Sequence, residues 1–354
     1  MRKRRVLYIG WVGFGNHGDD LCLDIFKSRL AAAAQEHELE IEVLALYPSR
    51  FDEFTLARLQ PDLVVLGAGS LFELVYLKPL ILAQQAGIPT AVWGSGYDGM
   101  QEDPVMPHDL AYAVRQVLSR AEAVGIRGPY TLRALANAGV PEESIAMVGD
   151  PGLLWLADEA APSEGEREQL PRLAVNWGTA YNNVLGGDEK ETAAQVAEAL
   201  FGLSSRFRLL FYPVWHRDIE PCRALAEVVG RERRVEVMTE VPTPQELKAV
   251  FIGSLCSINM KLHASVFSAA AGCPFVSLAY RWKCVDFAQS VGWERLAIPF
   301  SEPNLAAALQ EAIEQITADP QGHRHRLAQQ VAAVRQRLNK LEEQIFNILT
   351  SLPQ

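Results

Sequence analysis

The chain has 354 residues, of which 49% are hydrophobic and 21% charged, and its 33 Lys+Arg against 43 Asp+Glu give a formal net charge of −10. This composition is typical of a folded globular protein and excludes a disordered, collagen-like or disulfide-stabilised chain. The negative charge provides no general attraction for nucleic acid, and the length favours two domains over one.

Cysteine usage and the N-terminal residues predict a cytoplasmic protein. The five cysteines are odd in number and far apart, and no CxxC pair occurs, so we expect neither a disulfide framework nor a metal site. The basic run 1–5 resembles the start of a signal peptide, but glycines interrupt the apolar run behind it, which favours a first strand. Charges or glycines interrupt every apolar stretch of about 18 residues, so we expect no membrane-spanning helix. We expect at most peripheral contact with the inner face of the membrane.

Short aliphatic runs alternate with helical patterns along the whole chain, which is the signature of βαβ units with parallel sheets. In the first half the predicted strands are Val6–Ile9, Ile41–Leu46, Leu63–Leu66, Thr90–Trp93, Ala123–Ile126 and Ile145–Val148. In the second half they are Leu173–Trp177, Arg208–Tyr212, Val235–Met238, Ser254–Asn259 and Pro274–Leu278. The pattern predicts an α/β protein with two doubly wound, Rossmann-like domains that face one another across a cleft.

A polar, acidic segment between the two series of strands predicts the domain boundary. It contains Pro162 and Gly165 and has no apolar periodicity, as is typical of a linker. We therefore predict an N-terminal domain over 1–157, a linker over 158–171, a C-terminal domain over 172–320 and a C-terminal helix over 321–354.

Heptad spacing of apolar residues predicts that the C-terminal segment is a single long helix. The residues on its apolar stripe are Leu327, Val331, Val334, Leu338, Leu341, Ile345 and Ile348. Such a stripe is not left in water. It either packs on the body of the same chain or pairs two chains in a homodimer.

A glycine-rich loop follows the first predicted strand. It contains Gly15, Asn16, Gly18 and Asp19 and formally matches GxGxxG. Glycines there let backbone N–H groups approach an anion closely. The charge of Asp19 would repel a pyrophosphate, and no acid ends the second strand, so a dinucleotide-dependent dehydrogenase is the weakest candidate. The loop is either part of an active site or a turn whose acids cap the next helix.

Three further strands of the first half end in turns with polar or glycine residues. Gly69 and Ser70 follow the third strand, Arg127 follows the fifth and Asp150 follows the sixth. Strand ends of this kind line the ligand crevice of doubly wound folds. Arg127 is suited to a bidentate carboxylate or phosphate contact, with a surface arginine as the alternative. Asp150 is either a helix cap or part of the site.

In the second half, Lys261 and His263 lie where a strand leads into a helix, with Leu262 anchoring the segment between them. A cation and an imidazole at a helix N-terminus suit an anion and its proton donor. A structural histidine is the alternative. Further candidates at the ends of other strands are Tyr280, Lys283 and His216.

The order and combination of these motifs resemble the polysaccharide pyruvyl transferase family. The matching motifs are Gly15–Asp19, Gly67–Ser70, Asp150 with Pro151, Lys261–His263, and Tyr280 with Lys283. The sequence departs from the family pattern at three positions. Lys261 stands where arginine is usual, Gly128 replaces the acid after Arg127, and Thr131 replaces a serine.

The resemblance implies a GT-B-like fold and transfer of a carboxyethylidene unit from phosphoenolpyruvate to two sugar hydroxyls of a cell-surface glycan or its precursor. No cofactor is expected beyond phosphoenolpyruvate as donor, and the acceptor would be a free, nucleotide-linked or lipid-linked saccharide. Arg127, Lys261 and Lys283 would hold the donor's carboxylate and phosphate. His263 would be the general acid, and Asp19, Asp20 or Asp150 would orient or deprotonate sugar hydroxyls.

Two alternatives remain open at this point. A nucleotide-sugar glycosyltransferase of the same two-domain shape would also use glycine turns and a basic edge to hold a diphosphate. A saccharide-binding scaffold without activity would keep the fold and use the C-terminal helix as an interaction surface. The departures at Lys261 and Gly128 are the reason for considering the scaffold.

Overall fold

The computed structural model describes residues 3–157, 170–230 and 234–353. Its contacts divide the chain into two compact units. The first unit comprises Met1–Leu154 together with Ala333–Gln354, and the second comprises Trp155–Ala332. Most of the predicted linker, 158–169, lies outside the described residues.

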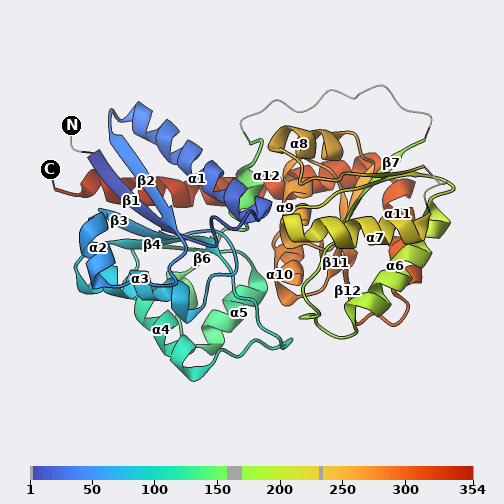
Figure 1. The fold of residues 1–354 in the computed structure, drawn as a ribbon. Coiled ribbons are helices and arrows are strands. Elements are labelled where there is room, and N and C mark those ends of the chain that lie inside the picture. The colour runs from blue at the N-terminus through green and yellow to red at the C-terminus, as the bar shows by residue number, and fades with distance from the viewer. Residues whose placement is uncertain (1–2, 158–169, 231–233, 354) are drawn as a thin grey trace. The chain divides into compact units, whose positions relative to one another are not determined.

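The first unit is built on a six-stranded parallel sheet with the order β2-β1-β3-β4-β5-β6 (Figure 1). Its strands are β1 Lys3–Ile9, β2 Glu40–Leu46, β3 Leu63–Leu66, β4 Thr90–Ser95, β5 Ala123–Ile126 and β6 Ala146–Met147. Strand β1 pairs with β2 on one side and with β3 on the other, so Val6 is opposite both Val43 and Leu63. The order therefore reverses between β1 and β3, which places the switch point of this sheet there.

Helices cover both faces of this sheet. They are α1 His17–Glu36, α2 Glu53–Leu59, α3 Leu74–Gln85, α4 His108–Leu118, α5 Pro129–Asn137 and the C-terminal part of α12 Pro320–Ser351. Leu7 and Val64 face a buried core shared with α2 to α5. Tyr8 and Trp93 point to the opposite face, where both rings pack on Phe26 of α1.

The second unit is built on another six-stranded parallel sheet, with the order β12-β11-β10-β7-β8-β9. Its strands are β7 Arg172–Asn176, β8 Arg208–Phe211, β9 Val235–Val237, β10 Cys256–Asn259, β11 Phe275–Ala279 and β12 Ala297–Pro299. The order reverses between β7 and β10, so the switch point of this sheet lies between their carboxyl ends.

The helices of the second unit follow from this strand order. They are α6 Glu189–Leu203, α7 Ile219–Val229, α8 Pro244–Ile252, α9 Leu262–Ala270, α10 Trp282–Ser290 and α11 Leu305–Ala318. Helix α6 packs between α7 and α11, whereas α9 packs beside α10. Right-handed crossovers explain this grouping. The connections from β7 to β9 and those from β10 to β12 run in opposite directions along the sheet, so their helices lie on opposite faces. Four single-turn 3₁₀ helices complete the structure, η1 Glu142–Ser144, η2 Pro151–Leu154, η3 His216–Asp218 and η4 Glu294–Leu296.

The predicted fold class is confirmed. Each of the eleven predicted strands overlaps an observed one, with ends that differ by up to three residues. Strand β12 was not predicted from the sequence. It has only three residues and ends in Pro299, so it is too short to show a recognisable run of strand-forming residues. None of the helices in the described part of the chain has both the length and the apolar character needed to cross a bilayer.

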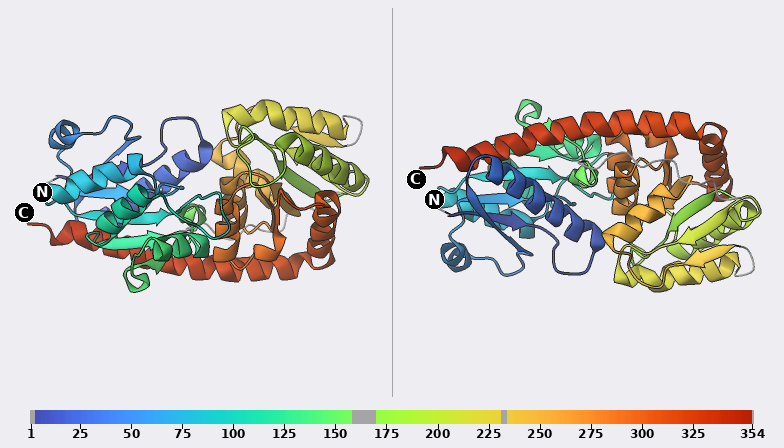
Figure 2. Two further views of the ribbon diagram at one scale, coloured as in Figure 1. Left: turned by 90° about the horizontal axis from the view of Figure 1, so that it is seen from below. Right: turned by 90° about the horizontal axis from the view of Figure 1, so that it is seen from above.

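Helix α12 is one continuous helix of 32 residues that belongs to both units (Figure 2). Of its predicted apolar stripe, all but Ile348 are buried in the single chain, and Phe346 and Leu349 are buried beside it. In the first unit, Leu341 packs so closely on Gly125 of β5 that a Cβ there would lie 2.3 Å from its methyl group. The stripe thus forms part of the chain's own core.

We predict that Leu338→Ala lowers the free energy of unfolding by about 2–5 kcal/mol, because it leaves a cavity beneath α12. Leu338 is fully buried. Gln336→Ala is the matched control on the exposed side of the same helix and is expected to change stability by less than about 0.5 kcal/mol. Urea denaturation followed by circular dichroism measures both variants. Equal stability of the two variants would contradict the packing described above.

Candidate functional site

The loop after β1 leads directly into helix α1. Asn16 is the N-cap, and its side-chain Oδ1 accepts a hydrogen bond from the Gly18 backbone N–H at 3.2 Å. Oδ1 of Asp20 accepts from the N–H of Gly13 at 3.4 Å. The capping side chain is therefore Asn16, and the two acids of the first turn add favourable charge near the positive end of the helix dipole.

Asp19 lies against the turn that follows β3. Gly69 in that turn has φ +120°, and a Cβ at this position would lie 3.3 Å from Oδ1 of Asp19. A residue with a side chain would therefore be strained here and would crowd the carboxylate. The Gly69 carbonyl also accepts a hydrogen bond from the Gly96 N–H at 2.7 Å, which joins the turns after β3 and β4. The switch point of the first sheet thus brings Asp19 and Gly69 together.

Arg127 is buried inside the first unit. Both terminal nitrogens of its guanidinium donate to Oγ of Ser70 at 3.3 Å. A Cβ on Gly96 would lie 2.3 Å from the same group, so this glycine is required for the close approach. The structure therefore places the predicted pair Ser70 and Arg127 in contact, with the guanidinium bracing the turns after β3 and β4.

Asp150 is fully buried at the end of β6. Its Oδ1 accepts a hydrogen bond from the Gly152 backbone N–H at 2.9 Å, whereas Oδ2 has no hydrogen-bond partner among the described residues. Burial raises the pKa of this carboxyl, and the charge of Arg127 opposes the rise. Asp150 therefore acts as a turn cap and also holds a proton more readily than an exposed aspartate.

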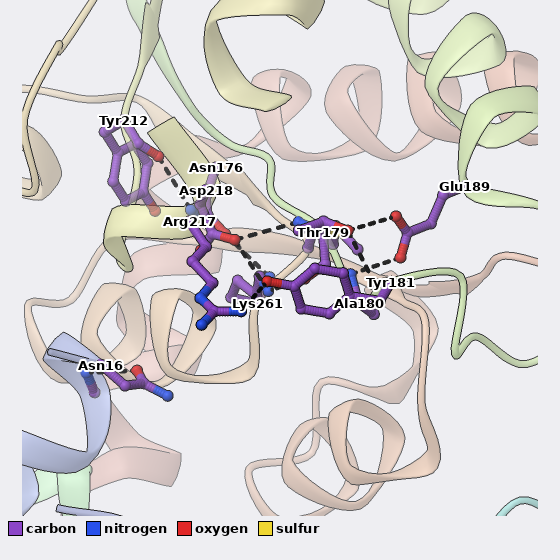
Figure 3. A network of polar contacts seen from close by, with 12 residues as sticks. Asn16, Asn176, Thr179, Ala180, Tyr181, Glu189, Tyr212, Arg217, Asp218 and Lys261 are labelled. Carbon is purple, nitrogen blue, oxygen red and sulfur yellow. Dashed lines mark hydrogen bonds and ion pairs between the residues drawn. The ribbon is translucent and has the colours of Figure 1, made fainter. Parts of the chain in front are cut away.

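The second unit holds a polar network at the switch point between β7 and β10 (Figure 3). Its centre is an ion pair between Nζ of Lys261 and Oδ1 of Asp218 at 3.1 Å. Nζ also donates to the Thr179 carbonyl at 2.6 Å. The backbone N–H of Lys261 donates to Oδ1 of Asn176, the last residue of β7, at 3.0 Å. Lys261 is therefore fixed at both its backbone and its ammonium group.

Asp218 is the buried anchor of this network. Its side chain is 0% exposed, whereas that of Lys261 is 14% exposed. Oδ1 also accepts from the Thr179 N–H at 3.2 Å. Burial raises the pKa of the Asp218 carboxyl, and Lys261 opposes that rise. A Cβ on Gly178 would lie 2.1 Å from Oδ1, so a glycine at this position makes room for the ion pair.

Aromatic rings surround the ammonium of Lys261. Its Nζ lies 5.5 Å from the ring centroid of Trp215 and 6.0 Å from that of Tyr280. Nζ of Lys283 lies 5.2 Å from the same Tyr280 ring. Two ammonium groups therefore lie near the ring of the buried Tyr280, whose negative π-face stabilises each positive charge. The ring thus links the surroundings of the two predicted cations, Lys261 and Lys283.

The two candidate histidines have different surroundings. His263 lies in the first turn of α9, and its ring stacks on Phe267 at 5.8 Å. Leu262 beside it is buried, in accord with an anchoring role. His216 is exposed, and its ring meets the edge of Trp215 at 5.4 Å. His263 thus adjoins Lys261 along the chain, whereas His216 lies on the outer side of Trp215.

Asp218, Thr179 and Asn176 belong to none of the site motifs predicted from the sequence. The signal that could have found them is position, because each lies just beyond or at the carboxyl end of a strand next to the switch point. Neither charge pattern nor spacing links Asp218 to Lys261, which lie 43 residues apart.

We predict that Asp218→Ala lowers the free energy of unfolding by about 3–5 kcal/mol, because it leaves the charge of Lys261 without its buried partner. Glu198→Gln is the matched control, since this acid is exposed on α6 and its removal should cost less than about 0.5 kcal/mol. Thermal and urea denaturation measure both. A stable Asp218→Ala variant would show that the ion pair does not hold this edge together.

Comparison with known proteins supports both the fold and the family. The structure is similar to Staphylococcus aureus MnaA in complex with UDP, with a TM-score of 0.64, 12% identity and 99% of each chain covered. It is also similar to the UDP-GlcNAc 2-epimerase of Methanocaldococcus jannaschii, with a TM-score of 0.56, 11% identity and coverage of 95% of this chain and 100% of that one. A glycosyltransferase of kitacinnamycin gives a TM-score of 0.57 at 14% identity, with both chains fully covered. At these identities the likeness shows a shared GT-B-like fold.

No curated protein gives a significant match to the sequence. The family model for polysaccharide pyruvyl transferase, in contrast, matches residues 16–281. This range begins at the N-cap of α1 and ends just after β11, so it includes the turn after β3 and the switch-point turns of the second sheet. The chain therefore belongs to the polysaccharide pyruvyl transferase family.

Proposed function

We propose that the protein transfers a carboxyethylidene group from phosphoenolpyruvate to two hydroxyls of a saccharide, which forms a pyruvate ketal and releases phosphate. Family membership supports the reaction class. The observation that carries the proposal is that the ammonium groups of Lys261 and Lys283 lie 6.0 Å and 5.2 Å from the centroid of the Tyr280 ring. Phosphoenolpyruvate has a carboxylate and a phosphate attached to the same carbon, and two ammonium groups could bind one each.

The chemistry of ketal formation defines what the site must supply. The methylene carbon of the donor gains a proton, and the neighbouring carbon then accepts the oxygen of one hydroxyl. Phosphate leaves, the second hydroxyl oxygen adds to the same carbon, and both hydroxyls lose their protons. The reaction therefore needs an acid near the methylene carbon, cations near the leaving phosphate and a base near the hydroxyls.

His263 is the proposed acid for the donor carbon. It lies two residues beyond Lys261, in the first turn of α9, where the helix dipole favours a bound anion. A donor held by Lys261 at this helix terminus would place its carbons near the same turn. The proposed base is an aspartate of the family motifs, Asp19 or Asp150.

We expect purified protein to release phosphate from phosphoenolpyruvate only when a suitable saccharide acceptor is added. A screen of free, nucleotide-linked and lipid-linked saccharides, with mass spectrometry of the products, measures this. Each ketal product should carry one carboxyethylidene group in place of two hydroxyl hydrogens. Acceptor turnover with a nucleotide sugar as donor, and none with phosphoenolpyruvate, would overturn the proposal.

His263→Gln should lower kcat by about 10²–10⁴-fold, because the variant lacks the proton donor, and should change the KM for phosphoenolpyruvate little. His325→Gln, an exposed histidine of α12, is the matched control. Steady-state kinetics with saturating acceptor measures both. If His263→Gln keeps near-normal kcat while folded, the acid is another group, and His216 is the next candidate.

Lys261→Ala should instead raise the KM for phosphoenolpyruvate at least about 10-fold, because the ammonium binds the anion in the ground state as well as in the transition state. Lys190→Ala removes an exposed lysine from the first turn of α6 and should leave KM unchanged. Because Lys261→Ala also leaves the buried Asp218 without its ion-pair partner, the kinetics are measured at a temperature at which circular dichroism shows both variants to be folded. An unchanged KM in Lys261→Ala would remove this residue from the donor site.

A nucleotide-sugar glycosyltransferase is the second candidate function. The observation that favours it is that solved structures of similar fold, such as MnaA, contain UDP. Isothermal titration calorimetry with UDP, with UDP-sugars and with phosphoenolpyruvate separates the two candidates. Heat of binding with UDP-sugars alone would favour this second function.

A further inference from the structure

We propose that Tyr181, Trp215 and Arg217 form the subsite for the ring of the acceptor sugar, next to the donor cation Lys261. These three residues are called the aromatic rim below. The proposal rests on the proposed function, because it gives the second substrate of that reaction a place in the second unit. None of the three residues belongs to the motifs on which the family resemblance rests.

The aromatic rim is a continuous surface of rings and guanidinium. The Arg217 guanidinium carbon lies 5.2 Å from the Trp215 ring centroid and 5.8 Å from that of Tyr181. One of its nitrogens donates to the Tyr181 hydroxyl at 2.6 Å, as Figure 3 shows. Tyr181 is 62% exposed, so a large part of the residue is accessible to a ligand.

The loop that presents Tyr181 is held in an unusual backbone conformation. Tyr181 and Asn182 have φ of +53° and +57°, a region that residues with side chains rarely adopt. Glu189 stabilises the loop, because its carboxylate accepts hydrogen bonds from Oγ1 of Thr179 and from the N–H groups of Ala180 and Asn182. Oδ1 of Asn182 in turn accepts from the N–H of Glu189 at 3.0 Å. The exposed tyrosine is therefore preorganised, which reduces the entropy lost on binding.

The chemistry of the aromatic rim fits a sugar ring. The C–H bonds on the face of a pyranose carry partial positive charge and pack on the negative π-face of an aromatic ring. The Arg217 guanidinium adds hydrogen-bond donors in one plane for hydroxyl oxygens. A purely apolar ligand would leave those donors unpaired. A polyanion would need more cations than this rim supplies.

The position of the aromatic rim agrees with a role in acceptor binding. Trp215 contacts both Arg217, at 5.2 Å, and the Lys261 ammonium, at 5.5 Å. A sugar stacked on the rim would therefore lie beside the cation proposed to hold the donor. Its hydroxyls would lie within reach of the donor carbon, as ketal formation requires.

Saturation-transfer NMR with methyl glycosides of glucose, galactose, mannose and N-acetylglucosamine tests the subsite without turnover. We expect transfer to the ring protons of at least one glycoside with the wild-type protein, and a loss of at least about 10-fold in affinity with Tyr181→Ala, which corresponds to about 1.4 kcal/mol. Tyr181→Phe keeps the ring and should retain most of the affinity. Tyr112→Ala is the matched control, since this tyrosine is 52% exposed on α4 of the first unit.

The outcomes separate the subsite from the proposed function. Loss of glycoside binding in Tyr181→Ala with a wild-type melting temperature supports the subsite, even if phosphoenolpyruvate is not turned over. Absence of glycoside binding in the wild type, or equal binding by Tyr181→Ala, overturns it. If UDP competes with the glycoside for the aromatic rim, the rim binds a nucleotide and the proposal is wrong. Where turnover is observed, the acceptor KM should rise in Tyr181→Ala while the KM for phosphoenolpyruvate stays unchanged.

Discussion

The buried ion pair of Asp218 and Lys261 is the interaction on which the second unit's candidate site depends. A fully buried carboxylate needs a compensating charge, and Lys261 supplies it at 3.1 Å. The same carboxylate accepts from the Thr179 N–H, and the lysine ammonium donates to the Thr179 carbonyl. These bonds tie together the chain beyond β7, β8 and β10. The pair therefore fixes where the cation lies before any ligand arrives, which is what a preorganised electrostatic site requires.

Much of the fold could be predicted from the sequence, because the spacing of apolar residues along the chain is a local property. Eleven strands, the parallel α/β class and the long C-terminal helix follow from apolar runs and heptad spacing. The strand order does not follow from them, since it depends on contacts between segments distant in the chain. For that reason Lys261 could be recognised as a cation at a helix start, whereas its partner Asp218 could not. The close contact between Gly178 and Asp218 also could not be predicted from the sequence, because it depends on the fold.

The two sheets use arginine and lysine in different ways at their carboxyl ends. In the first unit, Arg127 is fully buried and its planar fork braces two turns through Ser70. Its predicted contact with the donor stays a prediction. In the second unit, the Lys261 side chain is 14% exposed at a switch point. A rigid fork suits the crowded interior of the first unit, and a compact point charge suits an edge where a ligand has to approach.

The lysine at position 261, where arginine is usual in the family, has a consequence for donor binding. An ammonium has three donors, and Asp218 and Thr179 accept from Lys261 in the described structure, which leaves one for a ligand. One remaining donor cannot bind a phosphate and a carboxylate together. A second cation is therefore needed, and Lys283 lies on the Tyr280 ring that Lys261 also approaches. In the proposed donor site, the two lysines would therefore share the two anionic groups of the donor, each ammonium lying near the Tyr280 ring.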